Sequence, residues 1–124
     1  MASKISQESA LPYFFAGVWG LAGCIMLAMG SHPPASGILA TGGQFLLFHA
    51  CAVMGVANQT RFGGIYKRAA LALLLAGSAI FAGEIVIHSS AASFQVPMMA
   101  PLGGGMAILG WACIAIGVMR AEKN

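Results

Sequence analysis

Charged residues are scarce in this sequence. Of its 124 residues, six are Lys or Arg and three are Asp or Glu, so that only 7% are charged. An ordinary soluble domain is about one quarter charged. Because so few charged groups cannot give a soluble domain a polar surface, while a bilayer accepts apolar surface without penalty, the composition excludes a water-soluble protein. The chain is predicted to be an integral membrane protein of one domain.

Motifs for catalysis, metal binding and nucleic-acid binding are also missing. No phosphate loop, nucleophile triad or pair of carboxylates occurs in the sequence, so we expect a non-enzyme. The few cysteines lie in separate apolar runs at a spacing that matches no zinc or redox motif, and we interpret them as packing residues. These cysteines are Cys24, Cys51 and Cys113. The basic residues flank apolar runs and form no aromatic-interleaved patch, which argues against a nucleic-acid partner.

What the chain does contain is four long apolar runs. Each is close to the ~20 residues that a helix needs to cross about 30 Å of hydrocarbon. Pro12 suits the first position of the first helix, and Pro97 and Pro101 separate the last two runs. Since helices satisfy their own backbone groups in lipid, we predict an all-α bundle of four transmembrane helices. The predicted spans are residues 12–29, 38–56, 69–87 and 102–119.

The positions of the basic residues predict which side of the membrane each connection occupies. Lys and Arg lie in the N-terminal tail, in residues 58–68 and in the C-terminal tail, whereas residues 31–37 and 89–100 contain neither. By the positive-inside rule, both termini and the middle connection are cytoplasmic. We therefore expect a multi-pass protein of the inner (plasma) membrane, surrounded by lipid, with an N-in/C-in topology.

Small residues are abundant in the predicted spans. In the first span they recur every four positions, at Ala16, Gly20, Cys24 and Ala28. Such rows let helix backbones approach closely, which matters because apolar burial drives little association between helices already in lipid. The alternative is a gap that holds a pigment or a lipid. The predicted helix-packing positions are Gly20, Gly77, Gly83, Gly103 and Gly104.

Polar residues inside the spans are the candidate functional residues. Glu84 is the one acidic residue of the four spans, and an intramembrane charge costs from about 2.5 kcal/mol upward near the bilayer centre. His88 follows one helical turn later on the same face. On the second predicted span, Gln44 lies at a depth similar to that of Glu84 by helical rise. Thr41 lies nearer the outer end of that span, and His49 lies deeper. The functional hypothesis is a proton or ligand site, and the alternative is a set of interhelical hydrogen bonds that stabilise the bundle.

A haem held by two histidines is an alternative to this polar cluster. The expected depths of His49 and His88 differ by on the order of 15 Å, which is too far for the two axial ligands of one iron. The Gly103-Gly104-Gly105 segment lacks the preceding strand and the Lys of a phosphate loop. We therefore expect no cofactor and no metal.

Several short segments resemble a known family. They are Gln44-Phe45 with His49-Ala50, Pro101-Leu102-Gly103-Gly104 with Gly110-Trp111, the Gly77, Phe81 and Gly83 positions, and Gly30-Ser31-His32. Together they resemble the YgdD-like proteins, a small membrane-protein family of unknown function with eukaryotic transmembrane relatives. The resemblance implies four helices and membrane residence, with no assigned activity. The family commonly has Ser and an aromatic residue where this chain has Glu84-Ile85-Val86, and the segment 32–44 is short.

Two functions compete at this point. The leading hypothesis is a non-enzymatic accessory subunit of a larger membrane assembly, such as an energy-transducing complex, because the connections are too short to form a catalytic domain. Its partners would be other membrane-protein subunits, or further copies of the chain in a homo-oligomer. The alternative is a small transporter or proton conduit that uses Glu84.

Overall fold

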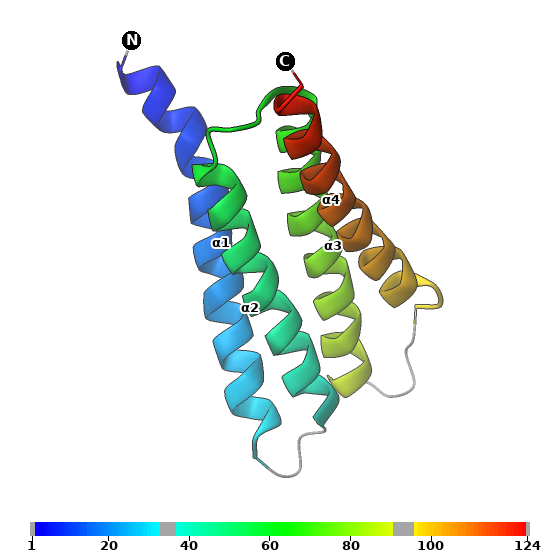
Figure 1. Ribbon diagram of the computed structural model, residues 1–124. Coiled ribbons are helices and arrows are strands. Elements are labelled where there is room, and N and C mark those ends of the chain that lie inside the picture. Colours follow the sequence, from blue (N-terminus) through cyan, green and yellow to red (C-terminus); the bar gives the residue numbers. More distant parts are fainter. Residues whose placement is uncertain (1, 33–36, 91–95, 124) are drawn as a thin grey trace.

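The computed structural model, which describes residues 2–32, 37–90 and 96–123, consists of four long helices (Figure 1). They are α1 (Ala2–Gly30), α2 (Gly37–Asn58), α3 (Gly64–Ser90) and α4 (Met99–Ala121). All four are long and apolar enough to cross a membrane; the 22 residues of α2 extend over about 33 Å. The prediction of an all-α bundle with four membrane-spanning helices is confirmed.

The helices begin earlier than the apolar runs indicated. Pro12 lies inside α1 and not at its first position, because this helix begins at Ala2. An interior proline loses one backbone hydrogen bond, a loss that neighbouring groups can offset in membrane helices. Pro101 lies in the first turn of α4, where its missing N–H has no helical partner to lose. Met98, just before α4, adopts a left-handed conformation with φ of 73°.

The helices pair as two antiparallel hairpins. The most extensive contacts are those of α1 with α2 and of α3 with α4, and the hairpins meet where α2 packs against α3. Helix α1 has few contacts with α3. The two ends of the chain and the α2–α3 connection lie at the same end of the bundle (Figure 1). This is the up-and-down arrangement that the distribution of basic residues requires.

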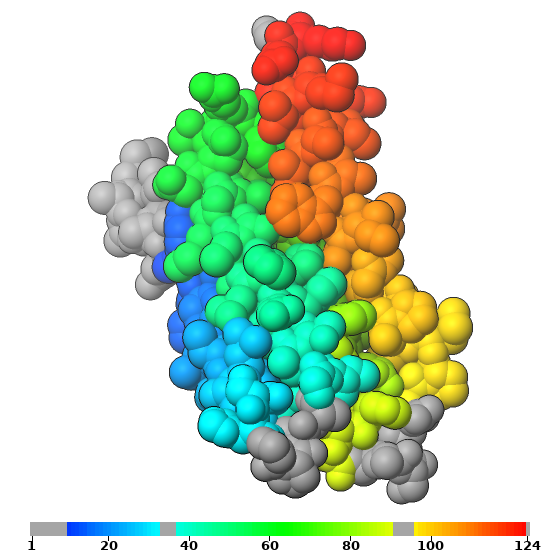
Figure 2. All heavy atoms as spheres, turned by 60° about the horizontal axis from the view of Figure 1, so that its bottom comes forward, coloured from blue at the N-terminus to red at the C-terminus, as the bar shows by residue number. Residues whose placement is uncertain are grey.

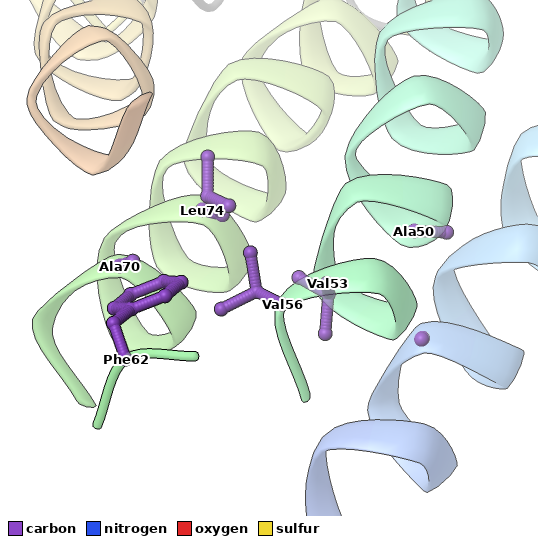
Figure 3. Packing of buried hydrophobic residues seen from close by; sticks show 7 residues of the cluster. Ala50, Val53, Val56, Phe62, Ala70 and Leu74 are labelled. Carbon is purple, nitrogen blue, oxygen red and sulfur yellow. The ribbon is translucent and has the colours of Figure 1, made fainter. Parts of the chain in front are cut away.

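The core consists of two clusters stacked along the α2–α3 contact. One lies toward the α2–α3 connection and comprises Ala16, Ala50, Val53, Val56, Phe62, Ala70 and Leu74 (Figure 3). The other lies toward the opposite end and comprises Met26, Leu39, Leu46, Ala82 and Ile85. The buried polar side chains, His49 and Ser78, lie between the two clusters along their helices. The middle of the bundle is therefore its polar level.

Glycines at intervals of seven let α4 approach α3 closely. In α4 these are Gly103, Gly110 and Gly117, all of which are buried. A methyl group on Gly103 would lie 2.7 Å from the carbonyl oxygen of Gly77. A repeat of seven, or 3.5 residues per turn, is that of left-handed helix pairs.

The predicted packing glycines differ in their surroundings. Gly77 and Gly103 meet backbone to backbone where α3 packs against α4. A methyl group on Gly83 would have the Met99 Cε atom at 3.8 Å, and one on Gly20 or Gly104 would have no neighbour within 4 Å. Packing through these glycines therefore concentrates at Gly77 and Gly103.

Candidate functional site

Half-way along the bundle, Trp19 connects α1 to α3. Its indole N–H donates to the Ser78 hydroxyl at 2.8 Å and to the Leu75 carbonyl oxygen at 3.2 Å. Ser78 is fully buried, and its hydroxyl donates in turn to the Leu74 carbonyl oxygen at 2.6 Å. Because α1 and α3 have few other contacts, this hydrogen bond is a principal link between them.

A second tryptophan connects α4 to α2 in the same way. The Trp111 indole N–H donates to Nε2 of His49 at 3.4 Å, and Nδ1 of His49 lies 2.7 Å from the Phe45 carbonyl oxygen. An indole N–H can only donate and a carbonyl can only accept, so Nε2 is the bare nitrogen and Nδ1 carries the proton. Both ring nitrogens of His49 are thus occupied, which leaves neither free to bind a metal or a haem iron.

Four rings form a column through this level. Phe81 of α3 lies 4.2 Å from Phe45 of α2, and Phe45 lies 4.2 Å from His49, measured between ring centroids. The Trp111 ring of α4 meets His49 edge-on at 6.2 Å. Aromatic pairs in offset or edge-to-face arrangements stabilise a contact beyond their buried area. The column therefore joins three helices at the level where the two indole N–H groups are bonded.

Polar groups at this level of the bundle cost free energy in lipid, and the buried ones all have hydrogen-bond partners. A polar group without a partner in hydrocarbon costs several kcal/mol. Every buried side-chain nitrogen and oxygen in the part of the chain that the structure describes has a hydrogen-bond partner. In the same residues, no group of three His, Cys, Asp or Glu side chains is placed to hold a metal ion. The polar groups of the core are thus used to hold the helices together.

The predicted polar cluster is distributed over three places. Thr41 and Gln44 are exposed on α2, Glu84 and His88 are half-buried on α3, and His49 is in the core beside Trp111. The Thr41 hydroxyl donates to the carbonyl oxygen of Gly37 in its own helix at 3.3 Å. Within the described residues, no hydrogen bond joins Gln44 to Glu84.

Sequence reasoning missed Trp19, Ser78 and Trp111. The signal was present, since both tryptophans lie in the middle of an apolar run and not at its ends. A tryptophan at that depth needs an acceptor for its N–H, and the few serines and histidines inside the spans are the side chains able to supply one.

An apolar groove opens beside Trp19. It has a volume of about 210 Å³ and lies between α1 and α3, over Leu46 of α2. Its other lining residues include Val18, Ala22, Met26 and Val86. A groove with such walls suits hydrocarbon.

Comparison with known proteins identifies the family. Residues 26–104 match the family described as "Protein of unknown function (DUF423)", which is more than half of the chain. The chain belongs to the DUF423 family. A relative in Haemophilus influenzae (strain ATCC 51907 / DSM 11121 / KW20 / Rd), called "UPF0382 membrane protein", is 26% identical over 83 residues, which are 67% of each chain. No solved structure matches.

These matches agree with the four apolar helices. The DUF423 chain is a multi-pass membrane protein, and the expected membership of a small membrane-protein family of unknown function is confirmed. The region matched by the DUF423 family contains His49 and Ser78, whereas Trp19 and Trp111 lie outside it.

Proposed function

We propose that this DUF423 protein is a non-enzymatic subunit of a larger assembly in the inner (plasma) membrane, with both termini in the cytoplasm. The orientation is supported by the basic residues, which lie in the two tails and near the α2–α3 connection, at one end of the bundle. The non-enzymatic role is supported by the polar level, whose groups bond to one another and to helix carbonyls.

One observation carries the role as a subunit. Gln44 is exposed on α2 seven residues after Gly37, about 10 Å inside the helix end by helical rise. An amide at that depth faces hydrocarbon, in which it can form no hydrogen bond. A second protein surface with a polar group at the same level would remove this cost.

The test is purification of the tagged protein from the membranes of its own organism in a mild detergent, followed by mass spectrometry. We expect a particle larger than one chain, with other membrane proteins in constant ratio to this chain, and we expect Gln44→Leu to reduce the size of that particle. A particle that contains this chain alone would contradict the assembly.

A second candidate function rests on Glu84, a half-buried carboxyl in the spanning helix α3. An acidic side chain in a membrane helix suggests a proton or ion pathway. Proton flux into vesicles that contain the purified protein tests it. Flux that Glu84→Gln abolishes and Glu84→Asp retains would support a conduit, and equal flux with and without the protein would reject it.

A further inference from the structure

The exposed residues of α2 form a regular stripe. Thr41, Gln44, Phe48, Cys51 and Gly55 are all exposed, and we call them the α2 seam. They are separated alternately by three and four residues. This is the spacing of the positions that meet where two helices pack as a left-handed pair. The contacts of α2 with α1 and α3 use its other faces.

The α2 seam differs in chemistry from the exposed faces of the outer helices. The large exposed side chains in the spanning parts of α1 and α4 are hydrocarbon, sulfur or aromatic groups, as expected for contact with lipid. They include Leu21, Ile25 and Met29 of α1 and Ile108, Leu109 and Ile116 of α4. The α2 seam instead carries the amide of Gln44 and the hydroxyl of Thr41. Figure 2 shows α2, in green to cyan, along the middle of one face with α1 on one side and α4 on the other.

We propose that the α2 seam binds the α2 seam of a second copy of this chain across a two-fold axis along the membrane normal. This inference deepens the proposed function, because it names one partner and the surface that binds it. Two copies inserted in the same orientation present parallel α2 helices, so residues of the same number meet at the axis. Gln44 then faces Gln44 of the other copy.

A glutamine pair suits such an axis. Each amide has an N–H donor and a carbonyl acceptor, so two related amides form two reciprocal hydrogen bonds. A single polar residue in an apolar seam also fixes the register and the number of helices, since any shift leaves it unpaired. At the end of the seam nearest the α2–α3 connection, a methyl group on Gly55 would have no neighbour within 4 Å, which leaves room for a helix to approach closely.

The cysteines of the chain provide the probes. Cys51 lies in the α2 seam and Cys113 lies on α4. Two variants each keep one of them: Cys24→Ala with Cys113→Ala, and Cys24→Ala with Cys51→Ala. Each is purified, placed in lipid vesicles at low protein density and oxidised with copper phenanthroline, and disulfide-linked dimers are measured on a non-reducing gel. Because a disulfide needs the two Cα atoms within about 7 Å, only positions near the axis can link.

We expect the variant with Cys51 to form dimers and the variant with Cys113 to remain monomeric. Adding Gln44→Leu to the Cys51 variant is expected to weaken dimer formation about tenfold, as lost interhelical hydrogen bonds in membranes do. Gln44→Asn, which keeps an amide, is expected to retain more of the dimer. No Cys51 dimer in a protein that unfolds cooperatively, equal linking through Cys113, or no effect of Gln44→Leu would each overturn the proposal.

The outcomes for the dimer and for the larger assembly are separable. A Cys51 dimer from a protein that copurifies with nothing else keeps the α2 seam and rejects the larger assembly. Constant copurification of other membrane proteins without a Cys51 dimer rejects the seam pairing and keeps the assembly.

Discussion

Gly23 of α1 and Gly43 of α2 meet backbone to backbone. A methyl group on Gly23 would lie 2.8 Å from the carbonyl oxygen of Gly43, and one on Gly43 would lie 2.7 Å from the carbonyl oxygen of Gly23. Gly77 and Gly103 have the same reciprocal relationship in the second hairpin, at 2.7 Å in both directions. Each hairpin thus contains a reciprocal contact between two glycines, and neither carbonyl can move aside without shifting a helix.

Adjacent glycines in α4 give a matched test of this contact. Gly103→Ala is expected to destabilise the protein by about 1–3 kcal/mol, because the added methyl forces α3 and α4 apart. Gly104→Ala adds the same methyl where no neighbour lies within 4 Å, so it is expected to be neutral or to stabilise by about 0.5–1 kcal/mol. Unfolding in detergent measures both, and equal effects would contradict the contact.

The bond between Trp111 and His49 is expected to contribute about 0.5–1.5 kcal/mol. Trp111→Phe keeps an aromatic ring and removes the donor, whereas His49→Phe leaves the indole N–H without its acceptor. Each single change leaves the other partner unpaired, namely Nε2 of the buried His49 in Trp111→Phe and the indole N–H in His49→Phe. We therefore expect both changes to destabilise the protein by more than the bond itself contributes. A double-mutant cycle, measured by unfolding in detergent, isolates the pair. Strictly additive effects would show that the two rings do not interact.

For Met98, unlike the residues above, we predict a substitution that does not destabilise the protein. Its left-handed conformation is unfavourable by about 1–2 kcal/mol for a residue with a side chain, and the side chain is 72% exposed. Met98→Gly is therefore expected to retain or raise the melting temperature. Met99→Gly, one residue into α4, is the control and is expected to lose about 1 kcal/mol. A lower melting temperature for Met98→Gly than for Met99→Gly would contradict the stated conformation.

The four spans could be predicted from sequence because a bilayer imposes one length and one composition on every crossing helix. The ends of the helices could not be predicted in this way. Helices α1 and α3 continue past the apolar runs, where water or headgroups replace hydrocarbon and composition no longer marks the helix. The row of small residues was ambiguous for a different reason. With 17 glycines in the chain, rows at intervals of four and of seven both occur, and the partner helix decides which one packs.

For the polar residues, too, the sequence does not indicate which face of a helix packs against its neighbours. Depth follows from helical rise, so the sequence predicts different levels for His49 and His88. Direction around the helix does not follow from rise. Gln44 and His49 are five residues apart on α2, yet one is exposed and the other is buried. Which face is buried depends on where α1 and α3 pack, and hydropathy alone does not contain that information.

Membrane topology can be tested with two single cysteines in a variant whose three native cysteines are replaced by alanine. Thr60→Cys lies in the α2–α3 connection and leaves every basic residue in place, and Met98→Cys lies just before α4. With a membrane-impermeant thiol reagent, we expect Thr60→Cys to react only in inverted vesicles and Met98→Cys only in right-side-out vesicles. Reaction of both from the same side would contradict the up-and-down arrangement.

The pairing of the helices into two hairpins has a consequence for biogenesis. The segments at the two hairpin tips, residues 31–37 and 89–98, contain no Lys, Arg, Asp or Glu. The connection at each tip can therefore cross the bilayer without a Lys, Arg, Asp or Glu side chain, and Glu84 is the acidic side chain that the second hairpin carries into the hydrocarbon. Helix α1 can join α2 while the ribosome is still making α3. In the orientation proposed above, the basic residues outside the spans remain on the side from which synthesis proceeds, which would hold each hairpin in place once it has crossed.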